Sequence, residues 1–290
     1  MDTLQPQPDP AAGLQRLIDE RALTILADLR PGASNGVTPG TFPGLLQSLE
    51  DRFPGLRVIG VCGDNGNAAG ARVAEGLALS AAKTGRRTLV IDTDARSPRQ
   101  HILWNGPGSP IGPGLRDTLV AGLPVSPDAI HPTRLSNCRL IPMGYPCDHS
   151  DPELFAHVHL EKLLGVHAPA MADTVVVAMP SLDMVAMCAA VGIHMDAVLV
   201  ALGSRVASDV VGANLDRLLE SGTRVAGVVV VPAGEESASA GSGATLETVV
   251  PIFPPPNPFA EGGAQPLRAQ SAAANADEKP SEGAVVSAGI

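Results

Sequence analysis

A glycine-rich loop follows the first strongly apolar run of the chain. Residues 58–78 read VIGVCGDNGNAAGARVAEGLA, the pattern of a strand, a loop and a helix. Backbone N–H groups of such a loop and the positive end of the following helix attract anions, so a phosphate or nucleotide is the expected ligand. The candidate site residues are Gly63, Asp64, Asn65, Gly66, Asn67, Gly70, Ala71, Arg72 and Arg96.

Two carboxylates follow the second apolar run, TLVIDTDARSP (88–98). Asp92 and Asp94 leave this predicted strand at the edge where the glycine-rich loop also emerges, so they are candidate site residues. The alternative is that both carboxylates only cap the end of the strand. Arg72 and Arg96 have a similar pair of interpretations, as anion ligands or as solvated and ion-paired surface groups.

Short apolar runs alternate with helix-length amphipathic runs between residues 57 and 231. Near-continuous Val, Ile and Leu strands indicate a sheet covered on both faces, and the alternation with helices indicates a parallel sheet. The fold class is therefore α/β, a parallel β-sheet flanked by helices. The predicted strands are 57–62, 88–93, 139–143, 174–179, 197–202 and 225–231, and the predicted helices are 70–84, 115–121, 151–165, 183–193 and 206–221.

The segments outside this α/β domain have different compositions. Residues 1–10 form a polar, proline-bearing lead, and apolar spacings of three and four predict a helix over 11–30, with a second helix at 44–52. The N-terminal helical segment thus covers 11–56. Residues 232–290 are acidic and rich in Ala, Ser, Gly and Pro, which is typical of disorder.

Charge and composition exclude several classes of function. A net charge of −10 argues against a general nucleic-acid-binding protein. The four cysteines show no C-x-x-C spacing, so no zinc site is predicted. The N-terminus lacks the apolar core of a signal peptide, and the most apolar stretch, 174–204, is interrupted by charged residues. These features predict a soluble, cytoplasmic protein without a membrane span.

The order of several motifs resembles the cytoplasmic ATPase module of bacterial tyrosine kinases and capsular or exopolysaccharide co-polymerases, which is related to septum-site and partition ATPases. This resemblance extends over residues 57–231 and implies a fold similar to P-loop NTPases, with a helix that ends in Asn-Leu-Ala after the P-loop. The matching segments are Gly76-Leu77-Ala78, Ile91-Asp92-Thr93-Asp94-Ala95-Arg96-Ser97-Pro98, Gly114-Leu115 with Leu119 and Gly122, Pro142-Met143-Gly144 and Asp151-Pro152-Glu153-Leu154.

The sequence departs from this family where phosphoryl transfer needs charge. Counted back from Gly76, the family's P-loop lysine falls on Gly70 and its Ser/Thr on Ala71. The carboxylate expected at the end of a later strand is replaced by Ala178. Of the carboxylates that the resemblance implies, Asp92 and Asp94 remain as candidate Mg²⁺ ligands and as the only candidate catalytic groups. Phosphoryl transfer depends on placing charge and metal, so these replacements predict the loss of turnover. The chain also lacks the family's tyrosine cluster, since Tyr145 is its only tyrosine.

These observations together predict a catalytically degenerate, pseudokinase-like protein that acts by binding. The resemblance implies a role in the regulation or assembly of exopolysaccharide synthesis and export. It also implies that the partners are a membrane co-polymerase, an active kinase relative or synthase components. Through such partners the protein would lie at the inner membrane, and it could also form homo-oligomers. No cofactor is expected, with ATP and Mg²⁺ as the alternative. The alternative functions are an active ATP-dependent tyrosine kinase with an unusual P-loop and a nucleotide sensor without turnover.

Overall fold

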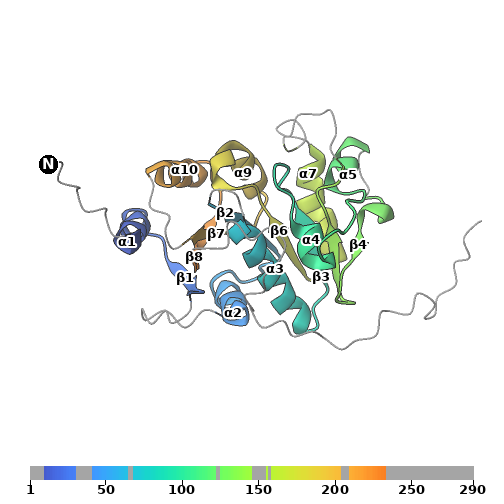
Figure 1. Ribbon diagram of the computed structural model, residues 1–290, viewed down its shortest axis with the longest axis horizontal. Coiled ribbons are helices and arrows are strands. Elements are labelled where there is room, and N and C mark those ends of the chain that lie inside the picture. The colour runs from blue at the N-terminus through green and yellow to red at the C-terminus, as the bar shows by residue number, and fades with distance from the viewer. Residues whose placement is uncertain are drawn as a thin grey trace, which may run out of the picture. The chain divides into compact units, whose positions relative to one another are not determined.

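The apolar runs of the sequence form the strands of one sheet (Figure 1). The structure is a computed structural model, and it describes residues 10–30, 41–64, 68–121, 125–145, 155, 158–203 and 209–232. The strands within these ranges are β1 (Ile25–Asp28), β2 (Val58–Gly63), β3 (Thr88–Asp92), β4 (His131–Pro132), β5 (Cys138–Ile141), β6 (Thr174–Ala178), β7 (Ala197–Gly203) and β8 (Val225–Val231).

The spatial order of the strands is β1-β8-β7-β2-β6-β3-β5-β4. All neighbouring pairs run parallel except β4 with β5, so the predicted parallel sheet is confirmed with one short antiparallel strand at its edge. Every residue of β2, β3 and β6 is buried. Burial on both faces explains why these strands read as continuous apolar runs rather than as alternating ones.

Helices cover both faces of the sheet (Figure 1). On one face α2 and α3 pack on the strands, together with Trp104 of α4, and on the other face lie α1, α5, α7, α9 and α10. The described helices are α1 (Pro10–Glu20), α2 (Phe42–Arg52), α3 (Ala68–Lys83), α4 (Gln100–Asn105), α5 (Leu115–Ala121), α7 (Val158–Lys162), α8 (Ala168–Met171), α9 (Val185–Gly192) and α10 (Asp209–Glu220), and single helical turns lie at Pro127–Ala129 and Leu182–Met184.

The N-terminal segment departs from its prediction. The sequence predicts one helix over 11–30, and this prediction is wrong beyond Glu20, where α1 ends. Ala22 takes a positive φ of 50°, and the chain then enters β1, which pairs in parallel with β8. A strand forms here because β8 offers an edge whose N–H and C=O groups need partners, and apolar spacing alone does not reveal that edge. The segment 11–56 is therefore not helical throughout.

A proline lies inside the helical region that follows β5. The sequence predicts a helix over 151–165, and the described part of this region continues as a helix from Val158 to Met171 through a π-helical turn at Leu163–His167. Pro169 has no N–H to donate, and the wider π turn just before it lets the helix continue past the missing bond. The start of the predicted helix, 151–157, lies outside the described residues except for Phe155.

None of the described helices has the length and continuous apolar character that a bilayer span requires. The predicted lead, 1–10, lies outside the described residues except for Pro10, and of the predicted tail, 232–290, only Pro232 is described.

Candidate functional site

The sheet brings the two candidate features to one edge. β6 lies between β2 and β3, and Ala178 at its end pairs with Val61 of β2 on one side and with Asp92 of β3 on the other. The glycine-rich loop leaves β2 at this edge, and Asp92 is the last residue of β3. The structure therefore places the beginning of the loop and the first carboxylate at the same edge of the sheet, as the sequence predicts, with the end of β6 between them.

The described start of the loop is tied to β7. Gly63 ends β2, and Asp64 is buried with only 4% of its surface exposed. The Asp64 N–H donates to the carbonyl oxygen of Ala201 (3.1 Å), and its Oδ2 accepts from the N–H of Gly203 (2.8 Å). The Asp64 backbone and carboxylate thus join the start of the loop to the end of β7. The next three predicted loop residues, Asn65, Gly66 and Asn67, lie outside the described residues.

The first turn of α3 carries no side chain that could bind a phosphate at the two positions where the family resemblance expects one. Gly70 and Ala71 are both buried, and neither has a charge or a hydroxyl group. Arg72, the next residue, is half-buried on the same helix. The carbonyl oxygen of Ala71 accepts a hydrogen bond from Nε2 of Gln100 (3.0 Å), which joins this turn to α4.

Asp92 is held by backbone N–H groups on both of its carboxylate oxygens. Its Oδ1 accepts from the N–H of Asp94 (3.1 Å), and its Oδ2 accepts from the N–H groups of Arg99 (3.1 Å) and Gln100 (3.0 Å). The last two bonds hold the start of α4 against the end of β3. This arrangement is that of a strand end whose carboxylate organises the following turn and helix start.

Burial changes the protonation of Asp92. The side chain is 1% exposed, and removal from water raises its pKa from 3.8 to about 7, against the lowering effect of its backbone N–H donors. The charge of the nearby Asp94 raises the pKa further. Around neutral pH this carboxyl therefore exists in large part as the neutral acid, which is a poor ligand for Mg²⁺.

Asp94 and Arg96 also have partners within the chain. Oδ1 of Asp94 accepts from the N–H groups of Arg96 (3.2 Å) and Ser97 (3.1 Å), which closes a tight turn after β3. The Arg96 guanidinium is 65% exposed and binds Oδ2 of Asp183 (2.6 Å), on the turn that follows β6. Of the two interpretations of Arg96, the structure favours an ion-paired surface group.

Gln100 and Trp104 complete this edge, and the sequence analysis did not single out Gln100. The amide of Gln100 is wholly buried, and its Oε1 accepts from Nε1 of Trp104 (3.2 Å). The Trp104 ring is 1% exposed, and the Arg134 guanidinium lies 5.2 Å from its centroid. α4 has six residues, too few for a periodic signal, so only the position of Gln100 eight residues after Asp92 could have drawn attention to it.

Comparisons with known proteins identify the fold. The sequence matches no protein-family model and no curated protein. Among solved structures, the chimerical protein CapA2B2 is 21% identical, has a TM-score of 0.63, and covers 75% of this chain and 99% of its own. The kinase domain of the Escherichia coli tyrosine kinase ETK is 17% identical, with a TM-score of 0.62 and coverage of 84% and 100%.

A third structure, the BceF tyrosine kinase domain, is 20% identical, with a TM-score of 0.57 and coverage of 78% of this chain and 90% of its own. This chain covers between 90% and 100% of the length of each of these three structures. The fold of this chain is therefore that of the bacterial tyrosine kinase domains.

Proposed function

We propose that this chain is a catalytically degenerate relative of the bacterial tyrosine kinases, which acts by binding protein partners rather than by phosphoryl transfer. The observation that supports this proposal most directly is the burial, protonation and hydrogen bonding of Asp92. Its carboxyl is buried, its pKa is raised to about 7 so that about half of it is neutral near pH 7, and backbone N–H groups bind both oxygens. A metal ion at this position would compete with the proton of the neutral form and with these N–H donors for the carboxyl oxygens.

The positive charge that phosphates require is also missing from the α3 turn. In P-loop enzymes a lysine neutralises the β- and γ-phosphates, and a hydroxyl holds Mg²⁺. The whole chain contains three lysines, Lys83, Lys162 and Lys279. Lys83 is the last residue of α3, about 20 Å along the helix from Gly70 at the usual rise per residue.

The energetic consequence is large for a reaction that depends on charge placement. Each charge-assisted contact to a phosphate contributes about 1.5–3 kcal/mol. The chain lacks the lysine, the hydroxyl and the carboxylate at Ala178, and these three losses concern the same transition state. Their combined effect, roughly 5–9 kcal/mol, corresponds to a rate reduction of about 10³-fold or more.

The first experiment titrates the full chain with ATP and ADP, with and without Mg²⁺, by calorimetry, and follows phosphate release in parallel. Trp104 fluorescence is a second readout, because Trp104 is the only tryptophan and its N–H binds the residue that caps Asp92. We expect no binding at nucleotide concentrations up to about 1 mM. A dissociation constant of about 1 mM corresponds to a binding free energy of only about 4 kcal/mol.

Other outcomes would each favour one of the alternatives. Micromolar binding with phosphate release would support an active kinase, and binding without release would support a nucleotide sensor. If binding occurs, Arg72→Gln tests whether this arginine replaces the lysine, with Arg52→Gln at the exposed end of α2 as the matched control. Binding that weakens only in Arg72→Gln would assign that role to Arg72.

The pathway is proposed on the family resemblance. We propose that the chain takes part in exopolysaccharide or capsule synthesis and export, through a membrane co-polymerase, an active kinase relative or synthase components. Such partners would hold it at the cytoplasmic side of the inner membrane. Calorimetric titration with the purified cytoplasmic segment of a co-polymerase encoded in the same gene cluster tests this proposal, and a coding region without polysaccharide genes around it would count against it.

A further inference from the structure

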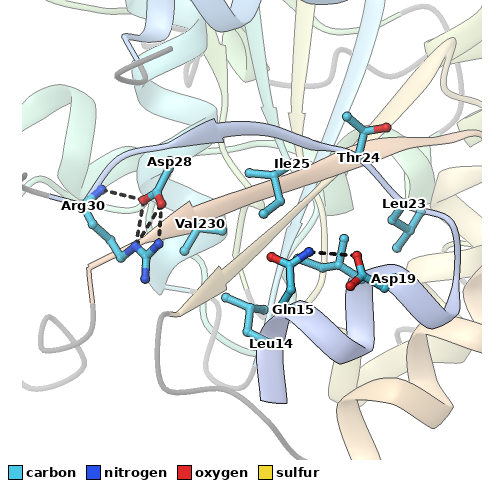
Figure 2. A pocket seen from close by; sticks show the side chains of 10 residues that line it. Leu14, Gln15, Asp19, Leu23, Thr24, Ile25, Asp28, Arg30 and Val230 are labelled. Carbon is cyan, nitrogen blue, oxygen red and sulfur yellow. Dashed lines mark hydrogen bonds and ion pairs between the residues drawn. The ribbon is translucent and has the colours of Figure 1, made fainter. Parts of the chain in front are cut away.

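A pocket of about 370 Å³ opens between α1, β1 and β8, away from the glycine-rich loop (Figure 2). Leu14 and Ile18 of α1, Ile25 of β1 and Val230 of β8 supply its apolar walls. The polar lining groups are Gln15, Asp19, Thr24, Asp28 and Arg30. The lining is thus about half apolar and half polar, and the cavity volume lies within the range of small-ligand sites.

One acid and one base of the pocket neutralise each other. Nε of Arg30 donates to Oδ1 of Asp28 (2.8 Å), its Nη2 binds Oδ2, and its backbone N–H also donates to Oδ1 (3.1 Å). Asp28 is 4% exposed, and the Arg30 guanidinium lowers the pKa of this carboxyl, which keeps it ionised. A buried carboxylate needs its cation, so Arg30 is committed to Asp28 and is not available for an anionic ligand.

The remaining charge of the pocket is Asp19. Its Oδ1 accepts a hydrogen bond from Nε2 of Gln15 (2.8 Å), and the residue lies exposed on the helix face at the pocket rim, as Figure 2 shows. Because the charges of Asp28 and Arg30 sum to zero, the lining residues carry a net charge of −1. Charge complementarity therefore selects a cationic group with an apolar stem, rather than an anion.

The strand beside the pocket offers a place for the backbone that would carry such a group. β1 is the first strand of the sheet, and no strand in the described part of the chain pairs with its outer side. The opposite edge strand, β4, is only two residues long and contains Pro132, which has no N–H. An unpaired edge accepts an extended peptide through main-chain hydrogen bonds, with side-chain pockets giving specificity.

We infer that the pocket receives a lysine side chain from an extended segment of a protein partner that pairs with the outer edge of β1. The butyl stem packs on Leu23 and Ile25, the partly exposed apolar residues of the lining, and the ammonium group binds Asp19. This inference rests on the proposed binding role, and it names a surface for that role. The two can fail separately, because peptide binding at β1 is measured without nucleotide.

The test uses ¹⁵N–¹H NMR spectra of the full chain with matched probes. The first pair is n-butylammonium, which is the lysine side chain without a backbone, and butyrate, which has a similar stem and the opposite charge. The second pair is the peptide acetyl-Thr-Val-Lys-Val-Thr-amide and its norleucine analogue. We expect the two cationic probes to shift the amides of Leu14, Ile18, Ile25 and Val230, and the lysine peptide also to shift Leu26.

The variants separate the Asp19 carboxylate from a general effect of charge. Asp19→Asn should weaken the lysine peptide about fivefold, as expected for a partly exposed ion pair. Asp51→Asn is the control, because Asp51 is an exposed acid on α2 that also accepts from a glutamine four residues earlier (2.8 Å). Equal binding of butyrate or of the norleucine peptide, shifts confined to residues outside both the pocket and β1, no shifts at all, or equal effects of the two variants would overturn the proposal.

Discussion

Replacement of Asp92 by asparagine tests whether this residue is a buried structural cap or a metal ligand. The pKa of Asp92 is raised from 3.8 to about 7 in the folded chain, mainly by burial. Between these two values the folded state holds a proton that the unfolded state has released. The free energy of unfolding therefore falls as the pH rises from about 4 to 7, and the Asp92→Asn variant lacks this component.

The magnitude follows from the size of the pKa shift. Three pKa units at about 1.4 kcal/mol each give at most about 4 kcal/mol. The wild-type chain should thus exceed Asp92→Asn in stability by a margin that shrinks by up to this amount between about pH 4 and pH 8. Urea unfolding at several pH values, followed by Trp104 fluorescence and circular dichroism without Mg²⁺, measures the difference directly.

Two results would refute this reasoning. A margin that grows with pH would mean that the N–H groups of Asp94, Arg99 and Gln100 stabilise the charged carboxylate more than burial penalises it. An increase of wild-type stability on addition of Mg²⁺ that is lost in Asp92→Asn would identify a metal site. Asp183→Asn serves as the control, because its partner Arg96 is 65% exposed, and an ion pair with an exposed partner should contribute less than about 1 kcal/mol to the free energy of unfolding.

Two further changes probe packing and charge elsewhere. Gly76→Ala should lower the free energy of unfolding by about 1–3 kcal/mol in the same urea assay, because a Cβ there would lie 2.4 Å from the Phe42 ring. Gly165→Ala is the control, and it should be neutral or stabilising because a Cβ there would have nothing within 4 Å. Equal effects of the two alanines would contradict the packing argument. Arg30→Ala should lower the free energy of unfolding by about 2–3 kcal/mol, because it leaves the buried Asp28 carboxylate without its cation. A decrease below about 0.5 kcal/mol would show that water reaches Asp28.

Gly76 also connects the altered P-loop helix to the rest of the fold. In the family that the sequence resembles, an asparagine precedes the Leu-Ala at this point, and here glycine makes room for Phe42 of α2. α2 packs closely on α3, and Leu45, Leu46 and Leu49 of α2 belong to the same apolar cluster as the strands. The helix that would position phosphates thus has a tight packing role on its opposite side.

Much of the sheet was predictable because its signal is local. Val, Ile and Leu runs gave β2, β3, β5, β6, β7 and β8 within one or two residues, and alternation with helices gave the parallel arrangement. The absence of a lysine and a hydroxyl at Gly70 and Ala71 was also visible in the sequence alone. Composition and order decide such features, since they do not depend on which distant residue becomes a neighbour.

Other features depended on contacts between distant segments, and only the tertiary structure decided them. β1 is a strand because β8, about 200 residues later, pairs with it. The burial of Asp92 and the Arg99 and Gln100 N–H groups at its carboxyl are not visible in the sequence, and they set its hydrogen bonds and its pKa. Its role as a metal ligand or as a cap stays a prediction. The pocket beside β1 arises from the same pairing, because hydrogen-bond geometry and burial are set in space rather than along the chain.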